Sequence, residues 1–215
     1  MKLFAYFRSS TSFRLRIALN LKQLEYDIIP VNLLESEQRG AAFTSRNPFA
    51  GVPMLEADGR DRAQSMAILE WLDEAHPANP LLPADIEDRF TVRELAYAIA
   101  TETHAPNNLQ VLQYLKAEFD ASPDQISAWY RHWLARTFGP IEARLEQLET
   151  GDFLLDAPGL FEVVLVPQLY NARRFALDLA PYPRMTRIEA ACLALEPFQR
   201  AHPDNQIDNP ERNPA

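Results

Sequence analysis

The chain has 215 residues, a formal net charge of −9 and a hydrophobic fraction of 47%. This length suits one large domain or two small ones, and the hydrophobic residues are numerous enough for a substantial core. A general nucleic-acid-binding protein would normally be basic, so the negative charge argues against that class. The sequence has no run of about 18 apolar residues and no apolar N-terminal stretch ending at a cleavage site, so neither a membrane span nor a signal peptide is expected.

Cysteine and histidine usage limits the chemistry that the chain can carry. Cys192 is the one cysteine in the sequence, so an internal disulfide is excluded and a reducing cytoplasm is the expected compartment. We expect Cys192 to be a small buried hydrophobic residue rather than a nucleophile. The four histidines are scattered and do not have the spacing of metal ligands, so no metal is expected.

The segment 1–76 alternates between strand-like and helix-like patterns. Alternating apolar residues indicate strands, and Phe13, Ile17 and Leu21 at helical spacing indicate the first helix. In chain order, we expect a strand at 2–7, a helix at 13–24, a strand at 26–31, a weak helix at 35–45, strands at 52–57 and 60–63 joined by the turn Asp58-Gly59, and a helix at 65–75. Together these elements predict a small α/β sandwich.

A proline-rich stretch, Pro77-Ala78-Asn79-Pro80-Leu81-Leu82-Pro83, interrupts this alternation. Three prolines so close together cannot continue a helix, so the stretch predicts a linker between a first domain at 1–80 and a second at 81–215. The second domain is expected to be all helical. We expect helices at 85–118, 122–148, 161–179 and 184–195, a kink or break at Pro140, and a frayed tail after His202.

Four consecutive hydroxyl residues, Ser9-Ser10-Thr11-Ser12, lie between the first strand and the first helix. Serine and threonine are preferred at helix N-caps, where the side-chain oxygen accepts a backbone N–H, so simple capping is one interpretation. A cap needs one hydroxyl and the sequence has four. Since a helix N-terminus also suits a bound anion such as a thiolate, the residues alone leave both interpretations open.

Two further pairs carry weaker signals. Val52-Pro53 precedes a strand, and an X–Pro bond is occasionally cis; a cis bond here would turn the backbone of Val52 outwards for pairing with an extended ligand. Gln64-Ser65 precedes a helix, where we interpret Ser65 as the N-cap. An N-cap with a glutamine before it is also a site for a carboxylate.

These signals occur in the order found in a known family. The stretch Arg8-Ser9-Ser10-Thr11-Ser12-Phe13-Arg14-Leu15-Arg16-Ile17-Ala18-Leu19 resembles the signature of the zeta-class glutathione transferases, which include the maleylacetoacetate isomerases and the bacterial maleylpyruvate isomerases. The resemblance extends to about His202, through Asn47-Pro48, Val52-Pro53, Gln64-Ser65, Glu70-Trp71-Leu72, Leu81-Leu82-Pro83, His104, Asn107-Asn108-Leu109, Leu165-Val166-Pro167-Gln168, Asn171-Ala172-Arg173-Arg174-Phe175 and Pro181-Tyr182-Pro183.

The resemblance implies a fold, a cofactor and the residues of a site. The fold would be a thioredoxin-like α/β domain at 1–80 followed by an all-α domain at 81–215, in a homodimer that binds glutathione. The site would consist of Ser9 as the hydroxyl that stabilises the glutathione thiolate, Ser10 and Thr11 in the rest of the sulfur pocket, Val52 and Pro53 at the cysteinyl backbone, Gln64 and Ser65 at the γ-glutamyl carboxylate, and Asn107 and Asn108 from the second domain.

The activity that the resemblance implies is a cis–trans isomerisation with glutathione as cofactor. The thiolate, favoured by a helix N-terminus and hydroxyl donors, would add to the cis double bond of a maleyl compound and leave after rotation. Arg8 and Arg174 would bind the carboxylates of this small dianionic substrate, because a guanidinium matches a carboxylate in geometry. Without the resemblance, a solvated surface residue is the better interpretation of Arg8, and a charge on a helix face is the better interpretation of Arg174. No nucleic-acid or membrane partner is expected.

Departures from the family pattern leave the substrate open. Thr11 stands where most of the class has cysteine, which favours maleylpyruvate, whereas Gln110 stands where the maleylpyruvate enzymes usually have arginine, which argues against it. Pro158-Gly159-Leu160-Phe161-Glu162 replaces the usual capping box of a core helix, although Glu162 can still reach back to a backbone N–H. Two alternatives remain: a glutathione transferase that acts on another electrophile, and a non-enzymatic binding or regulatory protein.

Overall fold

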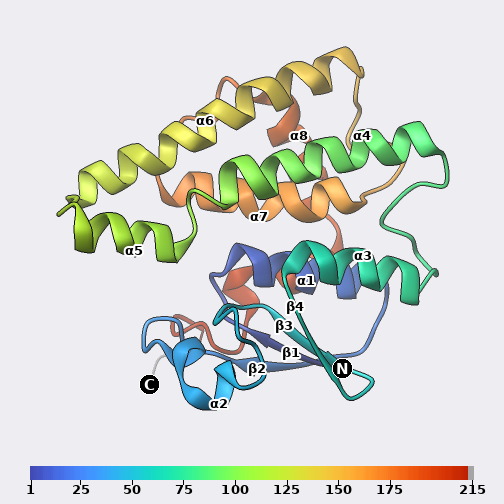
Figure 1. Ribbon diagram of the computed structural model, residues 1–215. Coiled ribbons are helices and arrows are strands. Elements are labelled where there is room, and N and C mark those ends of the chain that lie inside the picture. Colours follow the sequence, from blue (N-terminus) through green and yellow to red (C-terminus); the bar gives the residue numbers. More distant parts are fainter. Residues whose placement is uncertain (213–215) are drawn as a thin grey trace. The chain divides into compact units, whose positions relative to one another are not determined.

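The computed structural model describes residues 1–212, and the N-terminal part is built on a four-stranded sheet of order β2-β1-β3-β4 (Figure 1). The strands are β1 (Lys2–Ala5), β2 (Asp27–Pro30), β3 (Met54–Ala57) and β4 (Arg60–Ala63). β1 is parallel to β2 and antiparallel to β3, and β3 and β4 form a hairpin. All four expected strands are confirmed; β4 has the expected bounds and the others are shorter.

Two long helices cover one side of this sheet. α1 (Ser10–Leu21) and α3 (Ser65–Ala75) lie on the same side and pack against each other (Figure 1). The helix expected at 35–45 is instead a 3-10 turn, η1 (Glu37–Arg39), followed by the short helix α2 (Ala41–Thr44). Gly40 separates the two, and glycine is a poor residue for a helix interior.

Both arginines of α1 are buried, which is unusual for charged side chains. Arg14 and Arg16 are each 1% exposed. Arg16 Nε donates to the carbonyl oxygen of Ala201 at 2.9 Å, and Arg14 Nη1 donates to Ser65 Oγ at 3.3 Å. A buried cation needs such partners, and here they come from segments far away in the sequence.

The C-terminal segment belongs to the same compact unit as the sheet. The described chain forms two compact units, one of Met1–Leu82 together with residues 193–212, and one of Pro83–Cys192. The expected domain boundary after residue 80 stays a prediction, and residues 193–212 belong to the first unit. The physical reason is that α9 (Glu196–Ala201) packs on α1.

The tail after His202 was expected to be frayed, and for the residues up to 212 this expectation is wrong. A short turn, η3 (Pro203–Asn205), follows α9. The side-chain amide of Gln206 then donates to the carbonyl oxygens of Arg200 at 2.9 Å and His202 at 2.8 Å. Bonds from side chains to the backbone therefore fold a tail that has few apolar residues.

The second unit is all helical, as expected. Its helices are α4 (Ile86–Tyr97), the π-helical segment η2 (Ala98–His104), α5 (Leu109–Glu118), α6 (Pro123–Gln147), α7 (Leu160–Arg174) and α8 (Pro183–Leu193). Within residues 1–212, none of the helices combines the length and the hydropathy needed to cross a bilayer.

Prolines divide the second unit differently from the expectation. The helix expected at 85–118 is broken before α5, where Pro106 lies in the break and Asn108 caps the new helix. α6, in contrast, continues through Pro140. Pro140 removes the hydrogen bond to the carbonyl of Arg136, but both residues are exposed, so water can bind that carbonyl.

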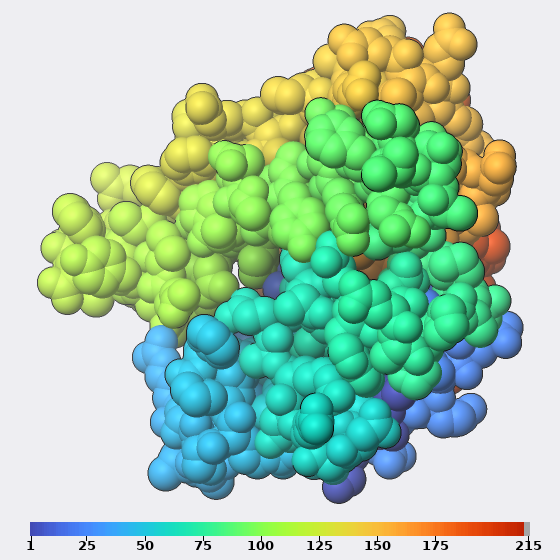
Figure 2. Space-filling view, turned by 45° about the vertical axis from the view of Figure 1, so that its right-hand side comes forward, coloured from blue at the N-terminus to red at the C-terminus, as the bar shows by residue number. Residues whose placement is uncertain are grey.

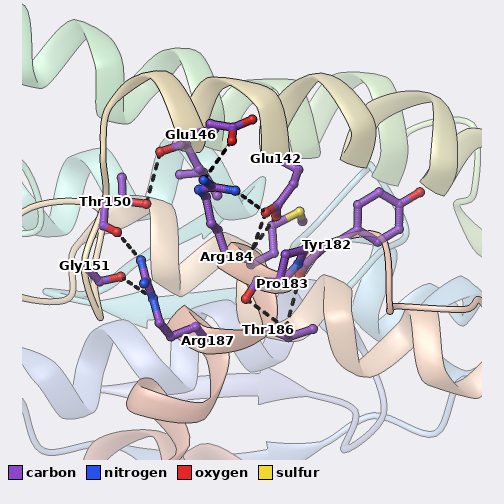
Figure 3. Close-up of polar contacts among 11 residues, drawn as sticks. Glu142, Glu146, Thr150, Gly151, Tyr182, Pro183, Arg184, Thr186 and Arg187 are labelled. Atoms are coloured by element: carbon purple, nitrogen blue, oxygen red, sulfur yellow. Dashed lines mark hydrogen bonds and ion pairs between the residues drawn. The ribbon is translucent and has the colours of Figure 1, made fainter.

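A carboxylate from α6 caps the N-terminus of α8 (Figure 3). Glu142 Oε1 accepts the backbone N–H of Arg184 at 2.8 Å, and its Oε2 accepts that of Met185 at 3.1 Å. The Arg184 side chain also contacts Glu142 and Glu146, and Arg187 donates to two backbone carbonyls just after α6. These bonds fasten α8 to the C-terminal end of α6.

An exposed ion-pair network joins the segment after α2 to the β3–β4 hairpin. Arg46 Nε donates to Asp61 Oδ2 at 2.8 Å, and its Nη2 donates to Glu56 Oε2 at 2.6 Å. In Figure 2 the light-blue segment that contains α2 lies against the teal segment of the hairpin, in agreement with these contacts. The hydrogen bond from Arg46 holds the pKa of Asp61 below its usual value.

Candidate active site

Ser9 stands where the segment after β1 meets α1. Its backbone is extended (φ −67°, ψ 119°) and its Oγ accepts the backbone N–H of Ser12 at 3.2 Å, so Ser9 is the N-cap of the helix. Ser9 is half-buried, whereas Ser10, the first residue of α1, is 6% exposed. The capping interpretation is therefore correct for Ser9. It does not compete with anion binding, because an oxygen that accepts still has its hydrogen to donate.

Thr11 links this serine to the backbone of Val52. Its Oγ1 lies 2.9 Å from Ser9 Oγ and donates to the carbonyl oxygen of Val52 at 2.9 Å. A carbonyl oxygen can only accept, so the single hydroxyl hydrogen of Thr11 is used at Val52. The bond between the two hydroxyls is then donated by Ser9. The three residues form one hydrogen-bonded chain.

The Val52–Pro53 peptide bond is cis, the geometry considered from the sequence. Pro53 is buried and Val52 is half-buried. Because the Val52 carbonyl accepts the Thr11 hydroxyl, the backbone expected to pair with an extended ligand lies directly beside the turn that carries the hydroxyl residues.

Gln64, rather than Ser65, is the N-cap of α3, which corrects the expectation from the sequence. Gln64 has a positive φ of 71°, and its side chain makes no capping bond. Ser65 is the first helical residue, 7% exposed, and its Oγ accepts from Arg14. The Ser65 hydroxyl hydrogen can therefore be donated outwards. A buried cation and a helix N-terminus at one place favour a carboxylate.

The two arginines expected to bind substrate lie in different units. Arg8 is in the first unit, and its guanidinium lies 5.4 Å from the centroid of the Phe7 ring and 5.9 Å from that of Tyr6. Arg174 is the exposed last residue of α7, and its Nη1 donates to Asn171 Oδ1 at 3.1 Å. Their joint action on one substrate stays a prediction.

Asn107 and Asn108 have structural roles in the second unit. Asn107 is buried, and its Nδ2 donates to the carbonyl oxygen of Tyr130 in α6 at 3.3 Å. Asn108 caps α5 by accepting the backbone N–H of Gln110 at 3.2 Å. Binding of glutathione by either side chain stays a prediction.

The altered capping box before α7 works through Glu162. Its Oε2 accepts the backbone N–H of Gly159 at 2.8 Å, as expected, and its Oε1 accepts that of Leu154 at 2.7 Å. Glu162 is 1% exposed, and this burial raises the pKa of its carboxyl. The glycine at the N-cap is therefore compensated by a carboxylate that holds two backbone groups.

Other reactive groups do not make a second site. Cys192 is buried, and burial raises the pKa of its thiol, so it is a poor nucleophile. Within residues 1–212, no three His, Cys, Asp or Glu side chains are grouped to hold a metal ion. A surface hollow of about 630 Å³ lies beside Arg184 and Arg187, but both guanidiniums already bond protein groups there (Figure 3).

Sequence analysis missed two contributions to the site. Arg14 supports Ser65, and Asp208 Oδ2 accepts the backbone N–H of Phe7 at 2.8 Å, just before the hydroxyl residues. Arg14 lies inside the family signature, so the sequence already marked its position as one that could contribute to the site. Nothing in the sequence around Asp208 indicates a contact with a residue at the other end of the chain.

Comparison with known proteins defines the class. Residues 1–74 match the family described as glutathione S-transferase, N-terminal domain. A solved structure described as holo maleylpyruvate isomerase, a bacterial glutathione transferase of the zeta class, matches with a TM-score of 0.95 and 42% identity over 97% of this chain and 100% of that chain. The fold is therefore that of the glutathione transferases, with a thioredoxin-like N-terminal domain and a helical C-terminal domain, as the sequence predicted.

Further relatives define the family within this class. A maleylpyruvate isomerase of Ralstonia is 42% identical over 211 residues, which cover 97% of this chain and 100% of the relative. A structure of maleylacetoacetate isomerase from Anaeromyxobacter dehalogenans, with glutathione in its active site, is 46% identical with a TM-score of 0.85 and covers 96% of both chains. This chain belongs to the zeta-class glutathione transferases, in the family of the maleylacetoacetate and maleylpyruvate isomerases.

Proposed function

We propose that this protein is a glutathione-dependent cis–trans isomerase of maleyl compounds, acting in aromatic-compound catabolism. The observation that carries the proposal is the hydrogen-bonded chain of Ser9, Thr11 and Val52, which combines a hydroxyl donor, a helix N-terminus and a peptide backbone in one place. When bound, glutathione supplies a thiolate that adds to the double bond and leaves after rotation, so it acts as a cofactor.

The residues of the first unit fit the parts of glutathione. Ser9 can donate its hydroxyl hydrogen to the sulfur once it releases Thr11, whose Oγ1 lies 2.9 Å from Ser9 Oγ, and the adjacent Ser10 is buried. The backbone at Val52 suits the cysteinyl peptide group. A thiol has a pKa near about 8.5, and a helix N-terminus and a hydroxyl donor both lower that value. Ser9 therefore has the role of keeping the sulfur ionised near neutral pH.

The γ-glutamyl carboxylate fits the N-terminus of α3. Gln64 and Ser65 begin this helix, and Ser65 Oγ accepts from the buried Arg14, which leaves its hydrogen for a ligand. Helix N-termini bind anions because their first N–H groups lack partners within the helix. Asn107 and Asn108 are proposed to add contacts from the second unit.

Two arginines are proposed to bind the maleyl substrate. The substrate is a dianion and the sulfur is an anion, so they repel each other unless cations offset the charge. Arg8 follows the end of β1, and Arg174 is exposed at the end of α7. Each guanidinium can form a two-point contact with one carboxylate, which would fix the direction in which the double bond faces the sulfur.

An assay with three substrates tests the proposal. Purified protein is incubated with maleylpyruvate, maleylacetoacetate or a chlorinated dinitrobenzene, with and without glutathione. We expect conversion of at least one maleyl compound to its fumaryl isomer, only when glutathione is present. Conjugation of the nitrobenzene without any isomerisation would favour the transferase alternative, and retention on a glutathione column without turnover would favour the non-enzymatic one.

We also propose that the protein is a cytoplasmic homodimer. Apolar side chains are exposed in each unit, with Ile86 and Phe90 on one face of α4 at 75% and 61% exposure and Phe49 at 68%. A two-fold interface would cover such residues. Light scattering at micromolar concentration should give about twice the chain mass of 24.5 kDa. A mass equal to one chain would contradict the dimer.

A further inference from the structure

We infer that Asp208 in the C-terminal tail and Arg16 in α1 act as positioning residues for the turn that carries Arg8 and Ser9. The inference rests on the function proposed above for those two residues. It gives a role to a tail that the sequence predicted to be frayed.

Phe7 is the residue through which the tail acts. Its backbone N–H donates to Asp208 Oδ2 at 2.8 Å, and its carbonyl oxygen accepts from Arg16 Nη2 at 3.0 Å. The same guanidinium donates through Nε to the carbonyl oxygen of Ala201 at 2.9 Å. The peptide groups on both sides of Phe7 are thus each held by a charged side chain. Hydrogen bonds of this kind are stronger than neutral ones.

The residue before Phe7 is held in the same way. The N–H of Tyr6 donates to Ser12 Oγ at 3.4 Å, and its carbonyl oxygen accepts the N–H of Ser9 at 3.0 Å. Every backbone polar group of Tyr6 and Phe7 therefore has a partner. β1 has already ended and α1 has not begun, so these bonds, rather than regular secondary structure, fix the turn.

Asp208 can hold Phe7 because the tail is itself ordered. Gln206, 3% exposed, donates to two backbone carbonyl oxygens of the preceding segment, and Asn209 is 5% exposed. Arg16 is 1% exposed, so its guanidinium is fixed between the turn and the end of α9. A carboxylate on a folded tail makes its bond with little further loss of conformational entropy.

The two residues after Phe7 are the ones with proposed chemical roles. Arg8 packs its guanidinium against the rings of Tyr6 and Phe7, and Ser9 caps α1. A rotation of the Phe7 peptide would displace both at once. Misplacement of a reacting group by about 1 Å can lower the rate about a hundredfold. Asp208 thus positions both Ser9, the proposed donor to the sulfur, and Arg8, the proposed substrate contact, without touching glutathione or the substrate.

Hydrogen exchange and ligand titration of three variants test this inference. Asp208→Ala removes the acceptor, and Asp208→Asn keeps an oxygen acceptor without the charge. Asp204→Ala is the matched control, because Asp204 is in the same tail, its side chain is 71% exposed, and its carboxylate pairs with the imidazole of the neighbouring His202 and not with the Phe7 turn. The measurements are the exchange rate of the Phe7 amide in the ligand-free protein, the pKa of the thiol of bound glutathione, and kcat/KM.

For Asp208→Ala we expect Phe7 exchange to become roughly tenfold faster or more, the thiol pKa to rise, and kcat/KM to fall about tenfold or more. Asp208→Asn should restore a large part of each value, and Asp204→Ala should match the wild type. Unchanged exchange in Asp208→Ala would overturn the inference. So would faster exchange with an unchanged thiol pKa, since the contact would then be only structural. The exchange and pKa readouts need no isomerase activity, so a failure of the proposed function would be seen separately.

Discussion

The hydroxyl of Thr11 donates to the carbonyl oxygen of Val52 at 2.9 Å. This bond determines which hydroxyl is the donor in the hydrogen bond between Ser9 and Thr11. Because the hydrogen of Thr11 is used at Val52, the hydrogen of Ser9 points at Thr11. Ser9 must therefore give up a hydrogen bond before it can donate to a thiolate. Thr11 and the sulfur compete for the same hydrogen.

Thr11→Val, which keeps the shape and removes the hydroxyl, should lower the pKa of the thiol of bound glutathione. A neutral hydrogen bond contributes about 0.5–1.5 kcal/mol, so the decrease should be up to about one unit. The thiolate absorbance is measured against pH at saturating glutathione, with Thr11→Ser as the control that keeps the competitor. A rise in the thiol pKa of Thr11→Val would mean that Thr11 donates to the sulfur instead.

Substitutions at Ser9 should separate helix capping from catalysis. Ser9→Ala removes both the cap of α1 and the sulfur donor, so it should lose about 1 kcal/mol of stability and about a hundredfold in kcat. Ser9→Gly should lose the same activity but only a few tenths of a kcal/mol of stability, since glycine is an acceptable cap.

Ser10→Ala should stay active, because Ser9 is the proposed donor to the sulfur. Kinetics and thermal unfolding check all three, and an inactive Ser10→Ala with an active Ser9→Ala would place the hydroxyl one residue later.

Arg174→Ala should raise KM for maleyl compounds roughly thirtyfold or more, because loss of one partner of a charged contact typically costs about 2–5 kcal/mol. Conjugation of a neutral chlorinated nitrobenzene should hardly change. Lys116→Ala, which removes an exposed positive charge from α5, is the control for a general effect of charge. If both activities of Arg174→Ala fall together, the arginine is structural and the proposed substrate contact is wrong.

Sequence patterns predicted the strands and the major helices because their apolar periodicity is a local property of the chain. Sequence patterns did not predict contacts with hydrogen-bond partners that are far away in the sequence. The pattern of α1 gives no reason to bury Arg14 and Arg16, and only the folded chain brings Ser65, Ala201 and Phe7 to them. The same holds for the tail, whose order depends on side-chain bonds that composition does not reveal.

Some features of the candidate site could likewise be predicted from the sequence, and others could not. The hydroxyl residues and Val52-Pro53 could be predicted because they lie within motifs, and the structure joins them through Thr11. The bond direction between Ser9 and Thr11 could not be predicted, since it depends on a carbonyl that the fold supplies. Asp208 was missed because no motif marks it.

Glu142→Gln should destabilise the second unit through α8. The carboxylate accepts two backbone N–H groups at the start of this helix, and the amide would offer only one acceptor there (Figure 3). A buried donor left without its acceptor costs about 1–3 kcal/mol, or roughly 2–10 °C in Tm. Glu146→Gln is the matched control, since that side chain is 66% exposed and pairs with the same Arg184. Equal Tm values for the two variants would contradict the capping role.

The Arg46–Asp61 pair should stabilise the protein at neutral pH and lose this effect in acid. Arg46 lowers the pKa of Asp61 in the folded state, so the folded protein binds this proton less tightly than the unfolded chain does. The contribution is complete above the unfolded value of about 3.9 and is lost as pH falls through the folded pKa. The pair is exposed, so Asp61→Asn should cost at most about 1 kcal/mol near neutral pH.

Thermal unfolding of Asp61→Asn and wild type at acid and neutral pH tests whether the stabilisation by the Arg46–Asp61 pair is lost in acid. The difference in Tm should shrink as pH falls below about 4, where the wild-type carboxylate takes up its proton. Glu35→Gln, at another exposed carboxylate, is the control for a general effect of removing one negative charge. A difference that grows in acid would contradict the assignment.

In the proposed reaction, glutathione serves as a cofactor and is not consumed. The measurement is the number of fumaryl product molecules formed per glutathione lost, with maleylpyruvate and maleylacetoacetate each in large excess over glutathione. We predict complete conversion of at least one of them with the free thiol concentration unchanged at the end. Loss of one thiol for each substrate molecule, or no conversion of either compound, would contradict the account.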